Sequence, residues 1–180
     1  MERHRGRERR GRAQYVLGRM YQRGDGVPHN YSEAMKCFRE AAELGDVNGQ
    51  YKLGRIYQRG MDVNRNYRKA EKWFRKAALQ GHAEAMYNLG VLCEKGLGLP
   101  RDIKEAEKLK LKAAEKGEAR AQNYYGVKYA KGEGVEKDFK VAYMWLHLAS
   151  IQGNKRAEKN IAILADKMSS EQISDAKHVE

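Results

Sequence analysis

Residues 47–82 read VNGQYKLGRIYQRGMDVNRNYRKAEKWFRKAALQGH, and a shift of 36 residues brings this unit onto its neighbours in the chain. The register continues without insertion from residue 11 to residue 154. Residues that share a position in successive units, here called a column, are often identical. Examples are Gly18/Gly54/Gly90/Gly126, Ala34/Ala70/Ala106/Ala142, Ala41/Ala77/Ala113/Ala149 and Gly45/Gly81/Gly117/Gly153. The sequence therefore predicts four repeats, at residues 11–46, 47–82, 83–118 and 119–154.

Each unit predicts two helices joined by a short turn. In the first unit, a helix from about residue 13 to residue 23 ends at Gly24, because glycine adopts the left-handed conformation that closes helices. Asn30 is a good N-cap for a second helix, which ends at Gly45. The same cap column holds Asn66, Asp102 and Asp138. The 18 glycines therefore mark helix ends and close approaches, and they do not argue against a helical protein.

Both predicted helices are amphipathic. At the helical period, Ala13, Leu17 and Tyr21 share one face of the first helix. The second helix has an apolar set of its own, made of Ala34, Cys37, Phe38, Ala41 and Ala42. One such hairpin cannot bury its apolar face alone, so the units are expected to stack into a continuous α-solenoid.

The repeated pattern resembles the Sel-1-like repeat, a relative of the tetratricopeptide repeat. The resemblance rests on residues 85–90, which read AMYNLG, and on residues 69–78, which read KAEKWFRKAA. Residues 142–149 (AYMWLHLA) and 167–173 (KMSSEQI) are similar to the closing segments of bacterial members. The resemblance implies an all-α, right-handed, tetratricopeptide-like superhelix over residues 11–154, with a C-terminal helical cap over 155–180. It also implies a scaffold or adaptor function.

Three positions depart from the family pattern, and one end of the chain lies outside it. Cys93 stands where the first helix of a unit usually has tyrosine, Lys110 replaces the aromatic of a second helix, and Asp62 replaces a turn glycine. In residues 1–10, arginine and glycine occupy the places of the expected alanines. Because this segment is highly charged and has little to bury, we expect it to be a disordered basic tail.

The charge of the chain favours acidic partners. The formal net charge is +12, and residues 1–12 contain six arginines against two glutamates. The two cysteines do not form a disulfide framework, which favours a reducing compartment. No apolar run is long enough to span a membrane, and no secretory signal is visible. We therefore expect a cytoplasmic protein, or a periplasmic or secreted one if the chain is a trimmed mature form.

The sequence offers no recognisable catalytic constellation. The Gly-x-Gly turns, such as residues 24–26, follow helices and lack the lysine and hydroxyl of a phosphate-binding loop. The five histidines and two cysteines have no metal-ligand spacing, and no activated nucleophile is apparent. We expect no enzyme activity, no cofactor and no metal.

The face of the first helices opposite the core is the candidate binding surface. In tetratricopeptide-like solenoids this side lines the concave groove. The candidate partner-binding residues are Tyr15, Arg19, Gln22, Arg23, Asn48, Tyr51, Arg55, Gln58, Arg59, Tyr87, Val91 and Asn123. The tyrosines fit packing between repeats equally well, and the arginines fit a solvated basic face.

These observations predict a monomeric scaffold or adaptor that binds a partner segment bearing acidic residues in its concave groove. The arginines carry the prediction, because nothing in the repeat requires them and their guanidinium groups suit carboxylates. The alternative is a nucleic-acid-binding adaptor that uses the same groove together with the arginine-rich N-terminal residues.

Overall fold

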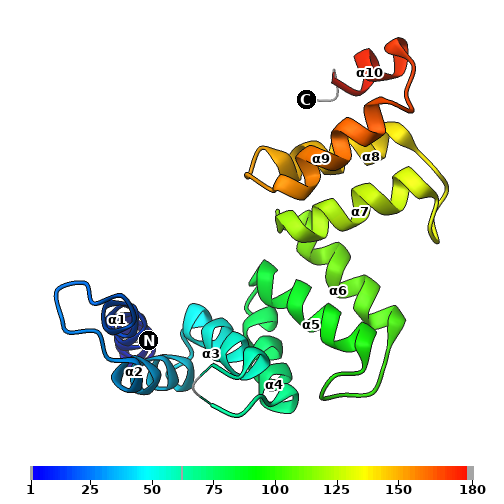
Figure 1. Ribbon diagram of the computed structural model, residues 1–180. Helices are drawn as coiled ribbons and strands as arrows, with labels where there is room; N and C mark the ends of the chain where they lie inside the picture. Colours follow the sequence, from blue (N-terminus) through cyan, green and yellow to red (C-terminus); the bar gives the residue numbers. More distant parts are fainter. Residues whose placement is uncertain (1, 62, 178–180) are drawn as a thin grey trace. The chain divides into compact units, whose positions relative to one another are not determined.

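The structure, a computed structural model, describes residues 2–61 and 63–177, and every regular element in these ranges is an α-helix (Figure 1). This confirms the predicted all-α repeat fold. The helices are α1 (Glu2–Arg23), α2 (Tyr31–Glu43), α3 (Val47–Arg59), α4 (Tyr67–Leu79), α5 (Ala83–Lys95), α6 (Ile103–Glu115), α7 (Ala119–Lys131), α8 (Phe139–Ser150), α9 (Lys155–Ala165) and α10 (Ser170–Lys177).

The chain divides into two compact units, Met1–Ala106 and Glu107–Glu180, with the boundary inside α6. We call them the N-terminal unit and the C-terminal unit. In the N-terminal unit, α1 packs against α2, α3 against both α2 and α4, and α4 against α5. In the C-terminal unit, α8 packs against α7, α9 and α10. Apart from the contact of α10 with α8, each of these pairs consists of neighbouring helices in chain order, as stacked hairpins require.

The helix boundaries follow the signals in the sequence. The side-chain oxygen of Asn30 accepts a hydrogen bond from the backbone N–H of Glu33 at 3.1 Å. Asn66 caps α4 in the same way, through the N–H of Lys69 at 2.9 Å. At the other end of the preceding helix, Gly60 has a φ of 72°, in the left-handed region that glycine tolerates.

Close approach of the two helices in a hairpin depends on the glycine column. A Cβ placed on Gly54 would lie 2.5 Å from Cδ1 of Phe74, whose side chain is fully buried. In the C-terminal unit, a Cβ on Gly126 would lie 2.5 Å from Cγ of Leu146. The glycine therefore makes room for the large apolar side chain of the second helix.

Buried glutamines fasten successive hairpins. Gln50 donates through Nε2 to the carbonyl of Ala42 at the end of α2, at 3.4 Å. Gln80, beyond the end of α4, donates to Oε1 of Gln50 at 2.8 Å. The pair Gln122 and Gln152 repeats the second contact at 2.8 Å in the C-terminal unit. These contacts satisfy backbone and side-chain groups that burial would otherwise leave unpaired.

The expected disordered tail is wrong for residues 2–10, which form the first turns of α1 (Glu2–Arg23). Arginine and glutamate are good helix formers, and the segment continues a helix that is already nucleated. Arg7 also donates to the carbonyl of Glu43 at 2.9 Å. The side chains of residues 5–10 are nevertheless exposed, and residue 1 lies outside the described residues.

The first repeat buries its apolar face less completely than predicted. Ala13 is exposed, and Leu17 and Tyr21 are half-buried, whereas Leu53 and Leu89 in the equivalent column are buried. In later repeats this face packs against the second helix of the preceding repeat, as α3 does against α2. The first repeat has no such helix before it in the described chain, so the same residues are more exposed.

The structure also bears on the two cysteines and on membrane spans. Cys37 and Cys93 are free and buried, and burial raises the pKa of each thiol. Among the described residues, none of the helices has the length and apolar character needed to cross a bilayer.

Candidate functional site

A pocket of about 210 Å³ lies on the face formed by α1 and α3. We call it the basic pocket, and its lining residues are Tyr15, Tyr51, Lys52, Arg55, Ile56, Arg59 and Met61. Four of these, namely Tyr15, Tyr51, Arg55 and Arg59, belong to the surface predicted from the sequence. The tyrosines of the first two repeats and the arginines of the second repeat therefore line one hollow, whereas Arg19 and Arg23 of the first repeat are not among its lining residues.

Both tyrosines of the basic pocket also pack against the core. The ring centre of Tyr15 lies 5.9 Å from that of Phe38, and the ring centre of Tyr51 lies 6.0 Å from that of Phe74. Each tyrosine is half-buried, so one side of its ring supports the hairpin while the rest remains accessible. The packing and binding interpretations of these residues are therefore compatible.

Five cations gather at this site, and Lys52 lies among them. Burial lowers the pKa of the Lys52 ammonium, and the charges of Arg55, Arg19, Arg23 and Arg59 lower it further. All four arginines predicted as binding residues thus act on one ammonium group. We call these five residues the cation cluster. Their convergence gives the N-terminal unit a concentrated positive surface for an anion.

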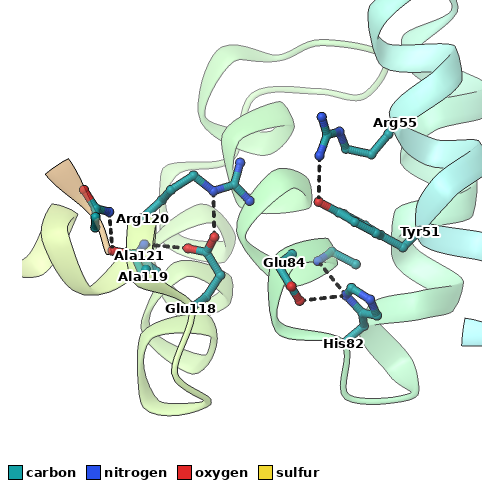
Figure 2. A network of polar contacts seen from close by, with 10 residues as sticks. Tyr51, Arg55, His82, Glu84, Glu118, Ala119, Arg120 and Ala121 are labelled. Atoms are coloured by element: carbon teal, nitrogen blue, oxygen red, sulfur yellow. Dashed lines mark hydrogen bonds and ion pairs between the residues drawn. The ribbon is translucent and has the colours of Figure 1, made fainter. Parts of the chain in front are cut away.

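The cation cluster has no carboxylate partner within the described part of the chain. Lys52 instead donates from Nζ to Oε1 of Gln22 at 2.7 Å and lies 5.1 Å from the ring centre of Phe38. Arg55 donates to the hydroxyl of Tyr51 at 3.2 Å (Figure 2). These neutral acceptors orient the two cations and carry no charge that would compensate them.

His82 supports the far side of Tyr51. The two rings are stacked with centres 4.5 Å apart (Figure 2). His82 caps α5 by accepting the N–H of Ala85 on Nδ1 at 3.3 Å, and the Glu84 carboxylate lies 3.2 Å from the same atom. Burial lowers the pKa of His82, against the opposing charges of Glu84 and Asp46. A neutral imidazole can accept the capping hydrogen bond, so the cap holds the wall of the pocket in place.

The remaining predicted residues fall into three groups. Gln22 is half-buried against Lys52, while Arg19 and Arg23 are exposed and close enough for their charges to act on Lys52. Asn48, Gln58, Tyr87 and Val91 also lie on α3 or α5 but do not line the pocket. Asn123 lies on α7 in the C-terminal unit, where its Oδ1 accepts a hydrogen bond from Asn160 at 2.8 Å.

Sequence analysis missed three pocket residues, Lys52, Ile56 and Met61. Lys52 stands three residues before Arg55 and seven before Arg59, a spacing that places all three near one side of α3. This spacing was a usable signal. The contact between Lys52 of the second repeat and Gln22 of the first could not be predicted from a helical wheel, because a wheel describes one helix at a time.

A second polar cluster lies in the C-terminal unit, around Glu107. Its carboxylate accepts hydrogen bonds from the Tyr124 hydroxyl at 2.6 Å and from the Lys128 ammonium, and the Tyr125 hydroxyl donates to its backbone carbonyl at 3.0 Å. Lys110, the departure from the aromatic column, is 1% exposed with its ammonium 4.2 Å from the ring centre of Tyr124. Here positive charge is matched inside the fold.

The carboxyl of Glu107 responds to these neighbours. Burial alone would raise its pKa, but the hydrogen bonds from Lys128 and Tyr124 and the charges of Lys128 and Lys110 outweigh burial. Its pKa therefore lies below the ordinary value. The Tyr125 hydroxyl shows the opposite effect, since burial and the nearby Glu107 raise its pKa. Among the described residues, no group of side chains is arranged to hold a metal ion.

The stacked hairpins and the open basic face define a helical repeat scaffold. The Sel1 repeat model matches residues 11–46, 47–82, 83–118 and 119–154, so the chain belongs to the Sel1 repeat family. Proteins of this family are generally protein-interaction scaffolds with a non-catalytic repeat fold.

Several solved structures are similar to the chain, including the following two. A Sel1 repeat protein from Oxalobacter formigenes is 32% identical, with a TM-score of 0.78, over 94% of this chain and 74% of the other. The protective antigen c5321 of uropathogenic Escherichia coli, which displays the same repeat fold, is 29% identical with a TM-score of 0.63. That match covers 93% of this chain and 44% of the antigen. No curated protein matches the chain.

Proposed function

We propose that the chain is a non-catalytic interaction scaffold whose N-terminal unit binds an acidic segment of a partner protein along α1 and α3. The observation that carries this proposal is the cation cluster, five positive side chains around a pocket with no carboxylate partner among the described residues. The basic face supplies charge, and the rings of Tyr15 and Tyr51 supply contact area at low entropic cost.

The energetics favour an external anion. Arg19 and Arg23, like Arg55 and Arg59, are four residues apart on one helix, and like charges at this spacing repel by a few tenths of a kcal/mol, on the order of 0.2–0.5. A bound carboxylate would remove this repulsion and the unfavourable environment of Lys52. Each charge-assisted hydrogen bond would contribute about 1.5–3 kcal/mol.

A second candidate is binding to single-stranded nucleic acid. Arg5, Arg9, Arg10 and Arg12 are exposed on α1, which continues from the binding face toward the N-terminus. Such a stripe would neutralise backbone phosphates and release counterions. The basic pocket is the feature that favours a protein segment, because it offers one anchor point and not a series of stacking platforms.

The test replaces Arg19, Arg23, Arg55 and Arg59 with glutamine and measures affinity for a glutamate-rich peptide and for a single-stranded RNA. The matched control removes the same charge from exposed positions of the C-terminal unit, by substituting Lys116, Arg156, Lys159 and Lys167 with glutamine. Both variants should melt like the parent protein.

We expect the arginine variant to lose peptide affinity roughly a hundredfold, the equivalent of two charge-assisted contacts, while the control variant loses little. Equal losses in both variants would show that net charge, and not this surface, drives binding. RNA binding that is tighter than peptide binding, with a steep salt dependence and sensitivity to Arg5, Arg9 and Arg10, would favour the second candidate.

A further inference from the structure

We propose that the basic pocket receives an aromatic side chain that carries its own anionic group, a phosphotyrosine of the partner segment. This inference rests on the proposed function, since it names the residue by which the bound segment is anchored. Three properties of the pocket support it: the nature of its walls, its size, and the arrangement of charge around it.

The walls of the pocket suit a flat apolar group. Ile56 contributes to the lining although its side chain as a whole is 0% exposed, so it forms part of the pocket's floor. Tyr15 and Tyr51 present aromatic rings, and Met61 contributes an adaptable thioether. Tyr51 is held between Phe74 on one helix and His82 at the start of the next, so this wall is already ordered before binding. A ring that enters the pocket therefore meets a preformed surface.

The size of the pocket fits one ring with a substituent. An apolar cavity of about 150 Å³ holds a benzene molecule, and a water molecule takes about 30 Å³ of the liquid. The basic pocket, at about 210 Å³, has room for a six-membered ring and a further small group. An acidic side chain alone would leave most of this volume empty, along with the contacts of its apolar walls.

The charge around the pocket suits a phosphate more than a single carboxylate. Lys52, Arg55 and Arg59 line it, and Arg19 and Arg23 stand near enough to act on Lys52. A phosphate monoester carries about −1.5 to −2 charges at pH 7 and has three strong acceptor oxygens. It can therefore engage the ammonium and guanidinium groups together, whereas one carboxylate offers two oxygens and one charge.

A ligand of this pocket must carry its aromatic ring and its negative charge close together, and this requirement distinguishes the possible ligands. In phosphotyrosine the phosphate is attached to the ring itself, which matches a single small pocket whose apolar and basic walls face one space. In a nucleotide a ribose separates the base from its phosphate. A phosphoserine has the charge without the ring, and an unmodified tyrosine has the ring without the charge. The geometry thus favours phosphotyrosine over each of them.

The experiment uses the full chain and one glutamate-rich peptide that differs only at its central residue, which is tyrosine, phosphotyrosine, phenylalanine or phosphoserine. Affinities are measured by fluorescence anisotropy, with phenyl phosphate and inorganic phosphate as competitors. We expect the phosphotyrosine peptide to bind at least tenfold tighter than any of the other three. Phenyl phosphate should compete at lower concentration than inorganic phosphate.

Two variants separate charge from ring recognition. Lys52→Met keeps an unbranched side chain but removes the ammonium, which lies 5.1 Å from the ring centre of Phe38, so it should reduce the preference for phosphotyrosine over tyrosine to threefold or less. Tyr15→Leu should reduce the preference for phosphotyrosine over phosphoserine. The control Lys72→Met removes an exposed lysine of the same unit and should leave both preferences unchanged.

Equal affinity for phosphotyrosine and phosphoserine would overturn this inference, because the pocket would then read charge alone. Equal affinity for phosphotyrosine and tyrosine, or preferences that survive both pocket variants, would also overturn it. In those cases the acidic peptides still bind, and their dependence on the four arginines keeps the proposed function intact. If none of the peptides binds, the proposed function fails together with the inference.

Discussion

The basic pocket of the N-terminal unit and the Glu107 cluster of the C-terminal unit occupy the same columns of the repeat. Lys52 and Ile56 on α3 stand where Tyr124 and Lys128 stand on α7, and Met35 on α2 stands where Glu107 stands on α6. In the C-terminal unit a cation meets a carboxylate of the preceding helix. In the N-terminal unit Met35 stands in the place of that carboxylate, and Lys52 and Arg55 donate to neutral oxygens of Gln22 and Tyr51, with no acid paired to them among the described residues.

This difference explains why one surface is expected to bind and the other is not. The Glu107 carboxylate uses the charge of Lys128 within the fold, which stabilises the hairpin but leaves little for a partner. The cation cluster has no comparable partner among the described residues, so its charges are expected to be available to an external anion. We propose that the same scaffold uses its charge for stability in one unit and for recognition in the other.

The largest loss of stability should follow from a side chain that blocks the close approach of two helices in either unit. A Cβ branch at Gly54 collides with the Phe74 ring, so Gly54→Val should destabilise the N-terminal unit by about 3 kcal/mol, at the upper end for overpacking. Gly126→Val should do the same in the C-terminal unit through Leu146. Hydrogen exchange should show each loss confined to its own unit, because repeats contact only their neighbours. Loss of protection throughout the chain in both variants would contradict independent units.

The second-largest loss of stability should follow from removing the carboxylate of Glu107. Glu107→Gln leaves Lys128 partly buried without its charge partner, so the C-terminal unit should lose about 2 kcal/mol. The contribution of Glu107 is complete above pH 4.5, the ordinary value of its pKa, and is lost as the pH falls through the lower pKa of the folded state. Thermal melts of the parent protein should show this acid-dependent step, and melts of the variant should lack it. The companion change Lys52→Met should not destabilise the N-terminal unit.

An added carboxylate in the N-terminal unit should compensate its cations, as Glu107 does for Lys128 in the C-terminal unit. Met35→Glu places a carboxylate in the Glu107 column, where it is expected to compensate the cation cluster from within. Affinity for the acidic peptide should fall about tenfold, which corresponds to about 1.4 kcal/mol. Met35→Gln, which has similar size and no charge, is the control and should bind nearly as well as the parent. An equal loss in both variants would mean that shape at this position matters and charge does not.

The smallest effect is the pH response of the His82 cap. Because the pKa of His82 is lowered in the folded protein, the unfolded chain takes up the proton first as the pH falls below 6.5, and stability declines from that point toward the folded-state pKa. Each tenfold difference in proton affinity costs about 1.4 kcal/mol. His82→Asn, which introduces the residue type that caps α9 at Asn154, should abolish this step in melts between about pH 5 and pH 7.5. If the pH-dependent loss of stability persists in the variant, it arises from the titration of another group.

The repeat columns predicted much of this structure because helix ends and close approaches depend on local residue types. Asn30 caps α2 and Gly60 ends α3, and both functions depend only on residues close in the sequence. The helical state of residues 2–10 was not predicted, since charge argued for disorder and helix propensity for order. The Glu107 cluster and the place of Lys52 were also missed. Both depend on contacts between side chains at least 21 residues apart, namely Glu107 with Lys128 and Lys52 with Gln22, which no single wheel contains.

The most direct test of this account is hydrogen exchange of the whole protein with and without a saturating glutamate-rich peptide. Bound anions should slow exchange in α1 and α3, where the cation cluster lies, and leave α7 to α9 unchanged. The Arg19, Arg23, Arg55 and Arg59 glutamine variant should lose this protection. Protection that appears instead in the C-terminal unit, or that survives in the arginine variant, would contradict the claim that uncompensated charge in the N-terminal unit makes the binding surface.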